Sequence, residues 1–229
     1  MVIKGLQKLT LLDYPGHLAC TVFTGGCNFR CPFCHNASLV LGKGEEEYTI
    51  EEFFDFLRKR QGTLEGVAIT GGEPLLQANI VDFIKKIKDM GFKVKLDTNG
   101  SFPEKLKELV SLDLVDYVAI DIKNSLNKYS KTVGRLGYDT ERVCESIKFL
   151  MDSDIEYEFR TTVVSELHSI EDIEEIGKMI EGAKRWYLQN FVDSGDLICA
   201  EMHGIDKEQM NQYIEIARKY VPNAEIRGA

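Results

Sequence analysis

The sequence lacks long apolar runs, a leader pattern at its N-terminus and any linker-like segment. Its apolar stretches are only a few residues long, whereas a membrane-spanning helix needs about 20, so we expect no membrane partner. The start, MVIKGLQKLTLLDYPG, has no basic stretch followed by an apolar core, as a secretion signal would. Because no Pro/Gly/Ser-rich segment divides the chain, we expect one domain over residues 1–229, with 184–229 as its C-terminal completion.

Basic residues are outnumbered by acidic ones. The chain has 28 Lys and Arg against 37 Asp and Glu, a formal net charge of −9. Since nucleic-acid phosphates are bound by Lys and Arg, we expect no nucleic-acid partner. The six cysteines do not form a disulfide pattern: three lie within residues 27–34, and Cys20, Cys144 and Cys199 are scattered singly. We expect the scattered three to be buried thiols and the protein to be cytoplasmic.

Short runs rich in β-branched and aromatic residues predict six strands. They are Leu18–Thr24, Gly66–Thr70, Phe92–Thr98, Asp116–Lys123, Glu156–Val164 and Arg185–Phe191, with a short seventh strand, AEIR, at the end of the chain. Amphipathic stretches between them predict helices. Thr49 and Glu52 form a capping box before one of these, and Ser169 and Asp206 open two others.

Repeated strand–helix alternation predicts parallel strands joined by helical crossovers. An open doubly wound sheet and a (β/α) barrel both fit this pattern. A complete eight-unit barrel usually needs about 250 residues, and we count six units. The predicted fold class is therefore α/β, an incomplete (β/α)6 TIM-type barrel of parallel strands. The clusters GGCNFRCPFCHN, TGGEP, DTNG and DIKN each follow a predicted strand, so we expect them at one rim.

Three thiols lie together in GGCNFRCPFCHN (residues 25–36), where Cys27, Cys31 and Cys34 form C-x3-C-x2-C. Iron–sulfur clusters are normally held by four cysteine thiolates, so three would leave one iron with the open position that catalysis needs. The alternative is a structural zinc site completed by His35 or a distant group. The chain has no second CxxC, and adjacent side chains such as Cys34 and His35 tend to point apart in an extended loop. The spacing therefore favours an iron–sulfur cluster.

The cysteine motif, with Phe33 before the last cysteine, resembles that of the radical S-adenosylmethionine (SAM) enzymes. The segments DYPGHLACTVFTGGCNFRCPFCHN, AITGGEPLLQ, KLDTNG and DYVAIDIK resemble, in this order, the activating enzymes of glycyl-radical proteins. The similarity is greatest to the activating proteins of anaerobic ribonucleoside-triphosphate reductase, with the pyruvate formate-lyase activases as near relatives. It extends from about Leu9 to Thr162 and strengthens the case for iron and sulfur over zinc.

The resemblance implies a [4Fe-4S] cluster on Cys27, Cys31 and Cys34, with SAM chelating the open iron through its amino and carboxylate groups. An electron from a reduced flavodoxin- or ferredoxin-type donor would cleave the sulfonium, and the resulting 5′-deoxyadenosyl radical would abstract a hydrogen atom. The product would be a glycyl radical on a partner protein. The protein's own task is to orient the cofactors and exclude water.

The resemblance also implies which residues contact SAM. Gly71, Gly72 and Glu73 in TGGEP would bind the methionine ammonium, although such a turn is a weak signal by itself and Glu73 could instead brace it. Phe33 belongs to the same cofactor-binding set. Lys123 would pair with the SAM carboxylate.

Two carboxylates end neighbouring predicted strands. Taken alone, Asp97 and Asp121 would each be a helix cap or a solvated carboxylate. Together they would crowd negative charge near the SAM carboxylate, which requires a cation. The resemblance implies a monovalent cation bound by Asp97, Thr98 and Asp121.

Asn99 and Arg160 each have two interpretations. Asn99 would bind the ribose hydroxyls of SAM or hold the TNG turn. Arg160 lies in an otherwise apolar strand, where an unpaired charge is rarely buried. It resembles an arginine that contacts SAM in the family, and the alternative is an ion pair with Glu158, which shares its face at period two.

One departure from the pyruvate formate-lyase activases concerns a histidine that reaches SAM after their sixth strand. Here that region reads NFVDSGDL, and the next histidine is His203. We read His17, His168 and His203 as surface or structural residues. We therefore predict an activase of anaerobic ribonucleotide reductase. The alternatives are a pyruvate formate-lyase-type activase, a small-molecule radical SAM enzyme such as a carboxy-deazaguanine synthase, and a zinc-stabilised binding module without catalysis.

Overall fold

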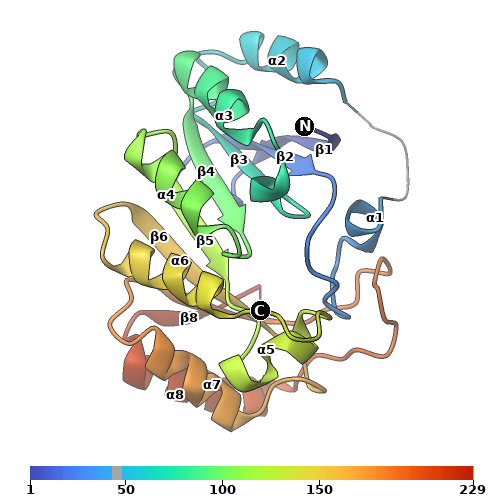
Figure 1. The fold of residues 1–229 in the computed structure, drawn as a ribbon, viewed down its shortest axis with the longest axis vertical. Coiled ribbons are helices and arrows are strands. Elements are labelled where there is room, and N and C mark those ends of the chain that lie inside the picture. Colours follow the sequence, from blue (N-terminus) through green and yellow to red (C-terminus); the bar gives the residue numbers. More distant parts are fainter. Residues whose placement is uncertain (43–47, 229) are drawn as a thin grey trace. The chain divides into compact units, whose positions relative to one another are not determined.

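The structure is a computed structural model that describes residues 1–42 and 48–228, in which strands and helices alternate along the chain (Figure 1). These residues form two compact units. The first consists of residues 1–28, 38–42, 48–98 and 104–118, and the second of residues 29–37, 99–103 and 119–228. The chain thus passes from one unit to the other several times, and it does so inside the cysteine motif.

The first unit contains four complete strands. They are β1 (Ile3–Thr10), β2 (Ala19–Thr24), β3 (Gly66–Gly71) and β4 (Lys93–Thr98). β1 is antiparallel to β2, whereas β2, β3 and β4 pair in parallel in chain order. The helical elements between and after these strands are α2 (Ile50–Arg58), the 3-10 helix η1 (Pro74–Leu76), α3 (Ile80–Asp89) and, except for its first residue, α4 (Pro103–Ser111).

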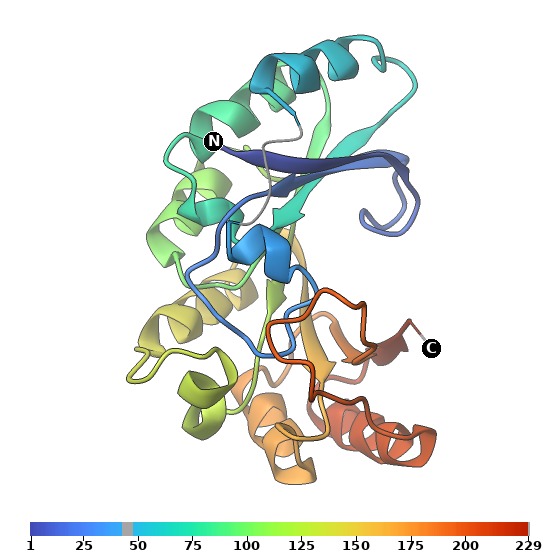
Figure 2. The same ribbon diagram turned by 90° about the vertical axis from the view of Figure 1, so that its right-hand side faces the viewer.

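The second unit contains the C-terminal elements. They are α5 (Leu126–Thr132), α6 (Glu141–Met151), β6 (Glu156–Val163), α7 (Ile170–Met179), β7 (Trp186–Asn190), α8 (Lys207–Tyr220) and β8 (Ala224–Arg227). β6, β7 and β8 pair in parallel in chain order. Helices α7 and α8 lie side by side in Figures 1 and 2, and α8 also contacts β7 and β8. Two short elements cross between the units along the chain, α1 (Ala37–Val40) and β5 (Tyr117–Asp121).

All seven predicted strands are present, each within two residues of its predicted ends. Strands β2, β3 and β5 can be read from sequence because they are buried on both faces and therefore appear as apolar runs, whereas β7 and β8 are only partly buried. Val22, Ile69 and Val94, on β2, β3 and β4, are fully buried. Within each unit the strand order follows the chain, without the reversal that defines a doubly wound sheet.

Strand β1 was not predicted. Its middle residues are half-buried or exposed, and its sequence, IKGLQKLT, carries two lysines and a glutamine. A strand that is buried mainly at its two ends, Ile3 and Thr10, has little of the alternating pattern that identifies strands. It is held by antiparallel pairing with β2, which is a tertiary interaction.

The predicted helix starts are confirmed. Thr49 and Glu52 form a reciprocal capping box, with Glu52 N donating to Thr49 Oγ1 at 3.1 Å and Thr49 N donating to a Glu52 carboxylate oxygen at 2.8 Å. Ser169 and Asp206 cap α7 and α8 with boxes of the same kind. Within the described ranges, no helix is both long and apolar enough to cross a bilayer.

Candidate functional site

In the first unit, the glycine turn after β3 packs directly on the segment that leads into the cysteine motif. A Cβ atom on Gly72 would lie 1.9 Å from the carbonyl oxygen of Gly26, and one on Gly71 would lie 2.3 Å from Thr24 N. Glu73 N donates to that same Gly26 oxygen at 2.9 Å. Gly71 also adopts φ 113°, a conformation that favours glycine. Only residues without side chains allow this backbone-to-backbone approach.

Glu73 is fully buried and braces this turn. One of its carboxylate oxygens accepts from Leu75 N at 2.9 Å and from Thr98 Oγ1 at 2.8 Å. The bracing role is therefore present in the structure, and it links the TGGEP turn to the end of β4. Asp97, beside Thr98, forms a buried ion pair with Lys95. The first unit thus brings together two of the predicted groups, TGGEP and the end of KLDT.

In the second unit, Asp121 lies between two cations. Arg160 Nε donates to one carboxylate oxygen at 2.8 Å, and Lys123 Nζ donates to the other at 3.2 Å. The alternative partner proposed for Arg160 is engaged elsewhere, since Glu158 holds Arg227 through two hydrogen bonds of 2.7 and 2.8 Å. Arg160 therefore projects towards the strand end that carries Asp121.

The surroundings of Asp121 and Lys123 keep both side chains charged. Burial alone would raise the pKa of Asp121, but the attraction of Arg160 and Lys123 outweighs it and holds that pKa well below its usual range. Burial alone would lower the pKa of Lys123, but Asp121 and the sulfurs of Cys31 and Cys34 raise it above its usual range. Lys123 is thus a permanent cation close to two of the three motif cysteines.

The part of the cysteine motif that belongs to the second unit is a buried turn. Cys34 N donates to Cys31 O at 3.0 Å, Cys31 and Phe33 are buried, and Cys34 is half-buried. Burial raises the pKa of the Cys34 thiol, whereas the positive charges of Lys123 and Arg30 lower it. Of the predicted residues, this unit brings together Cys31, Cys34, Asp121, Lys123 and Arg160.

The segment from β7 to α8 contacts this turn, which the sequence did not reveal. Cys199 N donates to Pro32 O at 2.9 Å, and Ser194 Oγ donates to His35 O at 3.3 Å. The His35 ring packs against Phe191, with ring centroids 5.1 Å apart. Figure 2 shows the two loops beside one another. The stretch after Lys184 therefore supports the cysteine turn as well as completing the fold.

Asn99 begins a tight turn in the second unit. Its Oδ1 accepts from Ser101 N at 3.0 Å and from the Ser101 hydroxyl. The structure therefore shows that Asn99 holds the turn, and its contact with ribose stays a prediction.

Three expectations about the remaining residues can be compared with the structure. His168 is structural, as expected: its Nδ1 accepts from Val164 N at 3.1 Å and its Nε2 contacts Lys123 O at 2.9 Å, in the tautomer with a proton on Nε2. Cys20 is buried, as predicted. The same prediction is wrong for Cys144 and Cys199, which are half-buried. Cys144 lies on helix α6, and Cys199 lies in the segment between β7 and α8.

The donor chemistry of the cysteine motif fits an iron–sulfur cluster. All six cysteines lie in the described ranges and none forms a disulfide. Among described residues, no three His, Cys, Asp or Glu side chains converge as a site for one metal ion. The thiolates of a [4Fe-4S] cluster each bind a different iron, so they need not converge on one point. Three thiols within eight residues, two of them near the fixed charge of Lys123, are the donors that such a cluster requires.

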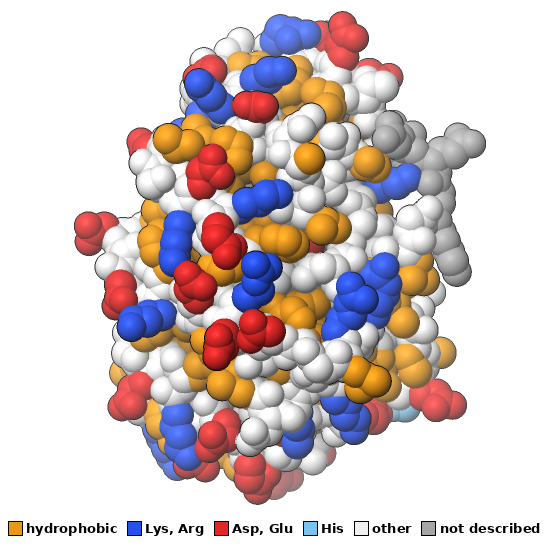
Figure 3. Space-filling model, in the orientation of Figure 1, with side chains coloured by type: hydrophobic (Ala, Val, Ile, Leu, Met, Phe, Trp, Pro, Cys, Tyr) orange, Lys and Arg blue, Asp and Glu red, His pale blue; other side chains and the backbone are white. Residues whose placement is uncertain are grey.

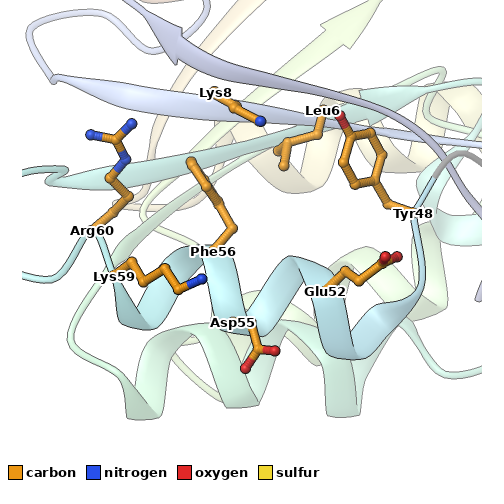
Figure 4. A pocket seen from close by; sticks show the side chains of 8 residues that line it. All are labelled: Leu6, Lys8, Tyr48, Glu52, Asp55, Phe56, Lys59 and Arg60. Carbon is orange, nitrogen blue, oxygen red and sulfur yellow. The ribbon is translucent and has the colours of Figure 1, made fainter.

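A pocket of about 510 Å³ lies in the first unit, between β1 and α2 (Figure 4). It is lined by Leu6, Lys8, Tyr48, Glu52, Asp55, Phe56, Lys59 and Arg60. None of the predicted site residues lines it, and its carboxylates are engaged by Thr49 and Arg58. Acidic and basic side chains are likewise interspersed over the face shown in Figure 3.

The sequence pattern of the radical SAM superfamily matches residues 21–196, which include the cysteine motif, the glycine turn and the strand ends described above. This chain belongs to the radical SAM superfamily, whose members use a [4Fe-4S] cluster and SAM. It is an enzyme of that type. The predicted fold class, an α/β chain of mostly parallel strands in an incomplete (β/α)6 barrel, is the radical SAM fold and is confirmed.

Individual relatives show a more specific similarity, to activating enzymes. The chain is 34% identical over 236 residues to a protein of Methanocaldococcus jannaschii named "Putative glycyl-radical enzyme activating enzyme MJ1227", covering 99% of this chain and 95% of that protein. It is 28% identical to the pyruvate formate-lyase-activating enzyme of Clostridium pasteurianum, covering 91% and 86% of the two chains. A domain of a pyruvate-formate lyase-activating enzyme from Bacteroides vulgatus has a similar fold, with TM-score 0.59 and 21% identity over 71% of this chain and 99% of that one.

Proposed function

We propose that this enzyme activates a glycyl-radical protein, and that its partner is an anaerobic ribonucleoside-triphosphate reductase. The observation that carries the proposal is the similarity over 99% of the chain to a protein named as a glycyl-radical enzyme activating enzyme. The choice of reductase rests on the sequence resemblance described first and on the lack of a histidine in the segment NFVDSGDL (residues 190–197). A pyruvate formate-lyase-type activase is the alternative that the relative from Clostridium pasteurianum favours.

In this proposal Cys27, Cys31 and Cys34 hold the cluster, which supplies the electron that cleaves bound SAM. Residues 1–229 act as one radical SAM domain, since the family pattern runs through segments of both compact units. A reduced flavodoxin- or ferredoxin-type protein delivers the electron, and the enzyme works in the cytoplasm.

The chain's own residues bind and orient SAM. Lys123, kept cationic by its neighbours, pairs with the SAM carboxylate, and Arg160 approaches the same ligand from β6. The bare backbone of Gly71 and Gly72 and the carboxylate of Glu73 bind the methionine ammonium. Further contacts come from Phe33 in the cysteine turn, from Asn99 at its turn, and from Asp97 and Asp121 at their strand ends.

A monovalent cation at Asp97, Thr98 and Asp121 is also part of the proposal. Each carboxylate already has a cationic side chain beside it, Lys95 in the first case and Arg160 and Lys123 in the second. A metal ion would therefore share these oxygens with the protein's own cations. SAM affinity measured in potassium, sodium and tetramethylammonium salts at equal ionic strength tests this, because only a specific site distinguishes the three.

The cluster assignment is tested by substitution of single thiols under anaerobic conditions. Cys34→Ser should abolish retention of iron and sulfide and the brown absorbance of the cluster. Cys144→Ser, which changes a half-buried thiol on α6 outside the motif, is the matched control and should retain both. A colourless, zinc-containing wild-type protein would instead support the binding module without catalysis.

The partner is tested by incubating the reconstituted enzyme with SAM, a reductant and each candidate glycyl-radical protein. We expect a glycyl radical signal in electron spin resonance with the reductase. A signal with pyruvate formate-lyase alone would transfer the assignment to that class. SAM cleavage without a protein radical on any candidate would favour a small-molecule enzyme such as a carboxy-deazaguanine synthase.

A further inference from the structure

Tyr129, on helix α5 of the second unit, is fully buried. Its ring belongs to an aromatic group with Phe29 and Tyr138, whose centroids lie 6.4 and 6.0 Å from that of Tyr129. The Phe29 ring also meets that of Tyr138 edge-on, at 4.9 Å. These contacts fix the phenol in place and leave it no route to solvent.

The hydroxyl of Tyr129 has no acceptor for its proton among the described residues. The backbone N–H of Lys123 donates towards the phenolic oxygen and lowers the pKa of Tyr129, but an N–H cannot accept the phenolic proton. The phenolic proton therefore lacks an acceptor. Buried hydroxyls nearly always have one, so a donor left in this state calls for an explanation.

The surroundings of this hydroxyl point to the cysteine motif. Burial raises the pKa of Tyr129 well above its usual value, and the neighbouring groups that act in the same direction are Tyr138, Cys31 and Asp121. Asp121 already holds Arg160 and Lys123. Of these groups, Cys31 is the one that a bound cluster would change, because its sulfur becomes an acceptor once it is a thiolate.

The position of Cys31 relative to Tyr129 is set within the second unit. Arg30 N donates to Val133 O at 2.8 Å, directly after the end of α5. Gly134 adopts φ 63°, and a Cβ there would lie 2.3 Å from Arg30 O, so the two backbones meet without an intervening side chain. The residue before Cys31 is thus fastened to the end of the helix that carries Tyr129.

We propose that Tyr129 donates its phenolic O–H to a sulfur of the cluster at Cys31 and thereby raises the reduction potential of that cluster. The inference rests on the proposed function, since it requires the cluster. A hydrogen bond to a cluster sulfur stabilises the additional negative charge of the reduced state, and such bonds are one of the factors that set iron–sulfur potentials. Tyr129 is in this sense a tuning residue, which acts on the reaction through the cluster.

The test is the midpoint potential of the reconstituted cluster in Tyr129→Phe, measured by redox titration followed by electron spin resonance. Phenylalanine keeps the ring and its packing and removes only the hydroxyl. At a fixed potential we expect the ratio of reduced to oxidised cluster to fall roughly threefold to tenfold, where tenfold corresponds to about 59 mV for one electron. Because an unsatisfied buried donor is removed, the cluster-free variant should unfold at the same temperature as the wild type or a higher one.

Tyr157→Phe is the control, since it removes a hydroxyl from another buried tyrosine of the same unit, one that accepts from Lys184 N at 3.3 Å, and should leave the potential unchanged. An unchanged potential in Tyr129→Phe, or an equal shift in both variants, overturns the inference while the proposed function stands. If wild-type protein retains no iron, the proposed function itself fails. A marked loss of thermal stability in cluster-free Tyr129→Phe would show that the hydroxyl has an acceptor within the protein, which also overturns the inference.

Discussion

The ion pair between Glu158 and Arg227 allows the packing of the second unit to be tested quantitatively. Glu158 on β6 is 0% exposed, and the Arg227 guanidinium reaches it from β8 through hydrogen bonds of 2.7 and 2.8 Å. Between them, on β7, the ring of Tyr187 lies under the guanidinium at 3.5 Å. Arg227→Leu removes the cation that compensates a fully buried carboxylate.

Breaking a buried pair by removing one partner typically costs about 3–5 kcal/mol. The Arg227 side chain is 30% exposed, so water screens the pair and the lower part of that range applies. We expect a loss of roughly 2–3 kcal/mol, which for a chain of this size lowers the unfolding midpoint by about 4–12 °C. Thermal and urea unfolding of cluster-free protein measure both quantities.

The pH dependence of this cost has a definite sign. In Arg227→Leu, burial without the guanidinium raises the folded-state pKa of Glu158 above its unfolded value of about 4.3. A group with a raised folded pKa contributes stability below its unfolded pKa and loses it as pH rises. The variant should therefore be closest to the wild type at acidic pH and fall furthest below it at neutral pH.

The double variant Glu158→Leu/Arg227→Leu is the control. Replacing both partners by apolar side chains removes the buried charge as well as its partner, so most of the lost stability should return. Wild-type stability of Arg227→Leu at neutral pH, or a double variant as unstable as the single one, would refute the reasoning.

Three further predictions concern local structure. Gly72→Ala should impair folding or SAM binding far more than Gly5→Ala, because its Cβ would lie 1.9 Å from the Gly26 carbonyl oxygen, whereas a Cβ on Gly5 would lie 3.4 Å from the Phe23 ring; comparative unfolding measures the difference. Thr49→Ala should cost about 1 kcal/mol in urea unfolding by removing the cap of α2. Burial lowers the pKa of His168, so its contribution to stability should be complete above about pH 6.5 and decline as pH falls; a pH series in which His168→Gln shows the same decline would contradict this.

Much of the fold was predictable because β2, β3 and β5 are buried on both faces and because helices α2, α7 and α8 begin with capping boxes. The β2 and β3 segments read as apolar runs, and Thr49 with Glu52 marks the start of α2 without any tertiary information. Strand β1 escaped because its central residues are half-buried or exposed, so its pattern is weak and its pairing with β2 defines it.

The candidate site was predictable in its chemistry and less so in its connections. The spacing of the cysteines and the order of the motifs are local properties of the chain. The partner of Arg160 could not be predicted, because Glu158 and Asp121 are both carboxylates at plausible positions. Only the arrangement of β6 and β8 shows that Glu158 binds Arg227 and that Arg160 binds Asp121. The support of the cysteine turn by Cys199 and Ser194 joins residues more than 150 positions apart, which no local pattern encodes.

The sequence by itself determined the family, the proposed donor atoms of the cluster and the succession of strands and helices, since each depends on residue types at short and regular spacing. The tertiary structure decided which charges are paired, which glycines are required by backbone contact, and that the Tyr129 hydroxyl is enclosed without an acceptor in the described part of the chain. These depend on distances between segments remote in sequence, and burial then fixes their energetic weight, because an unpaired polar group is costly only where water cannot reach it.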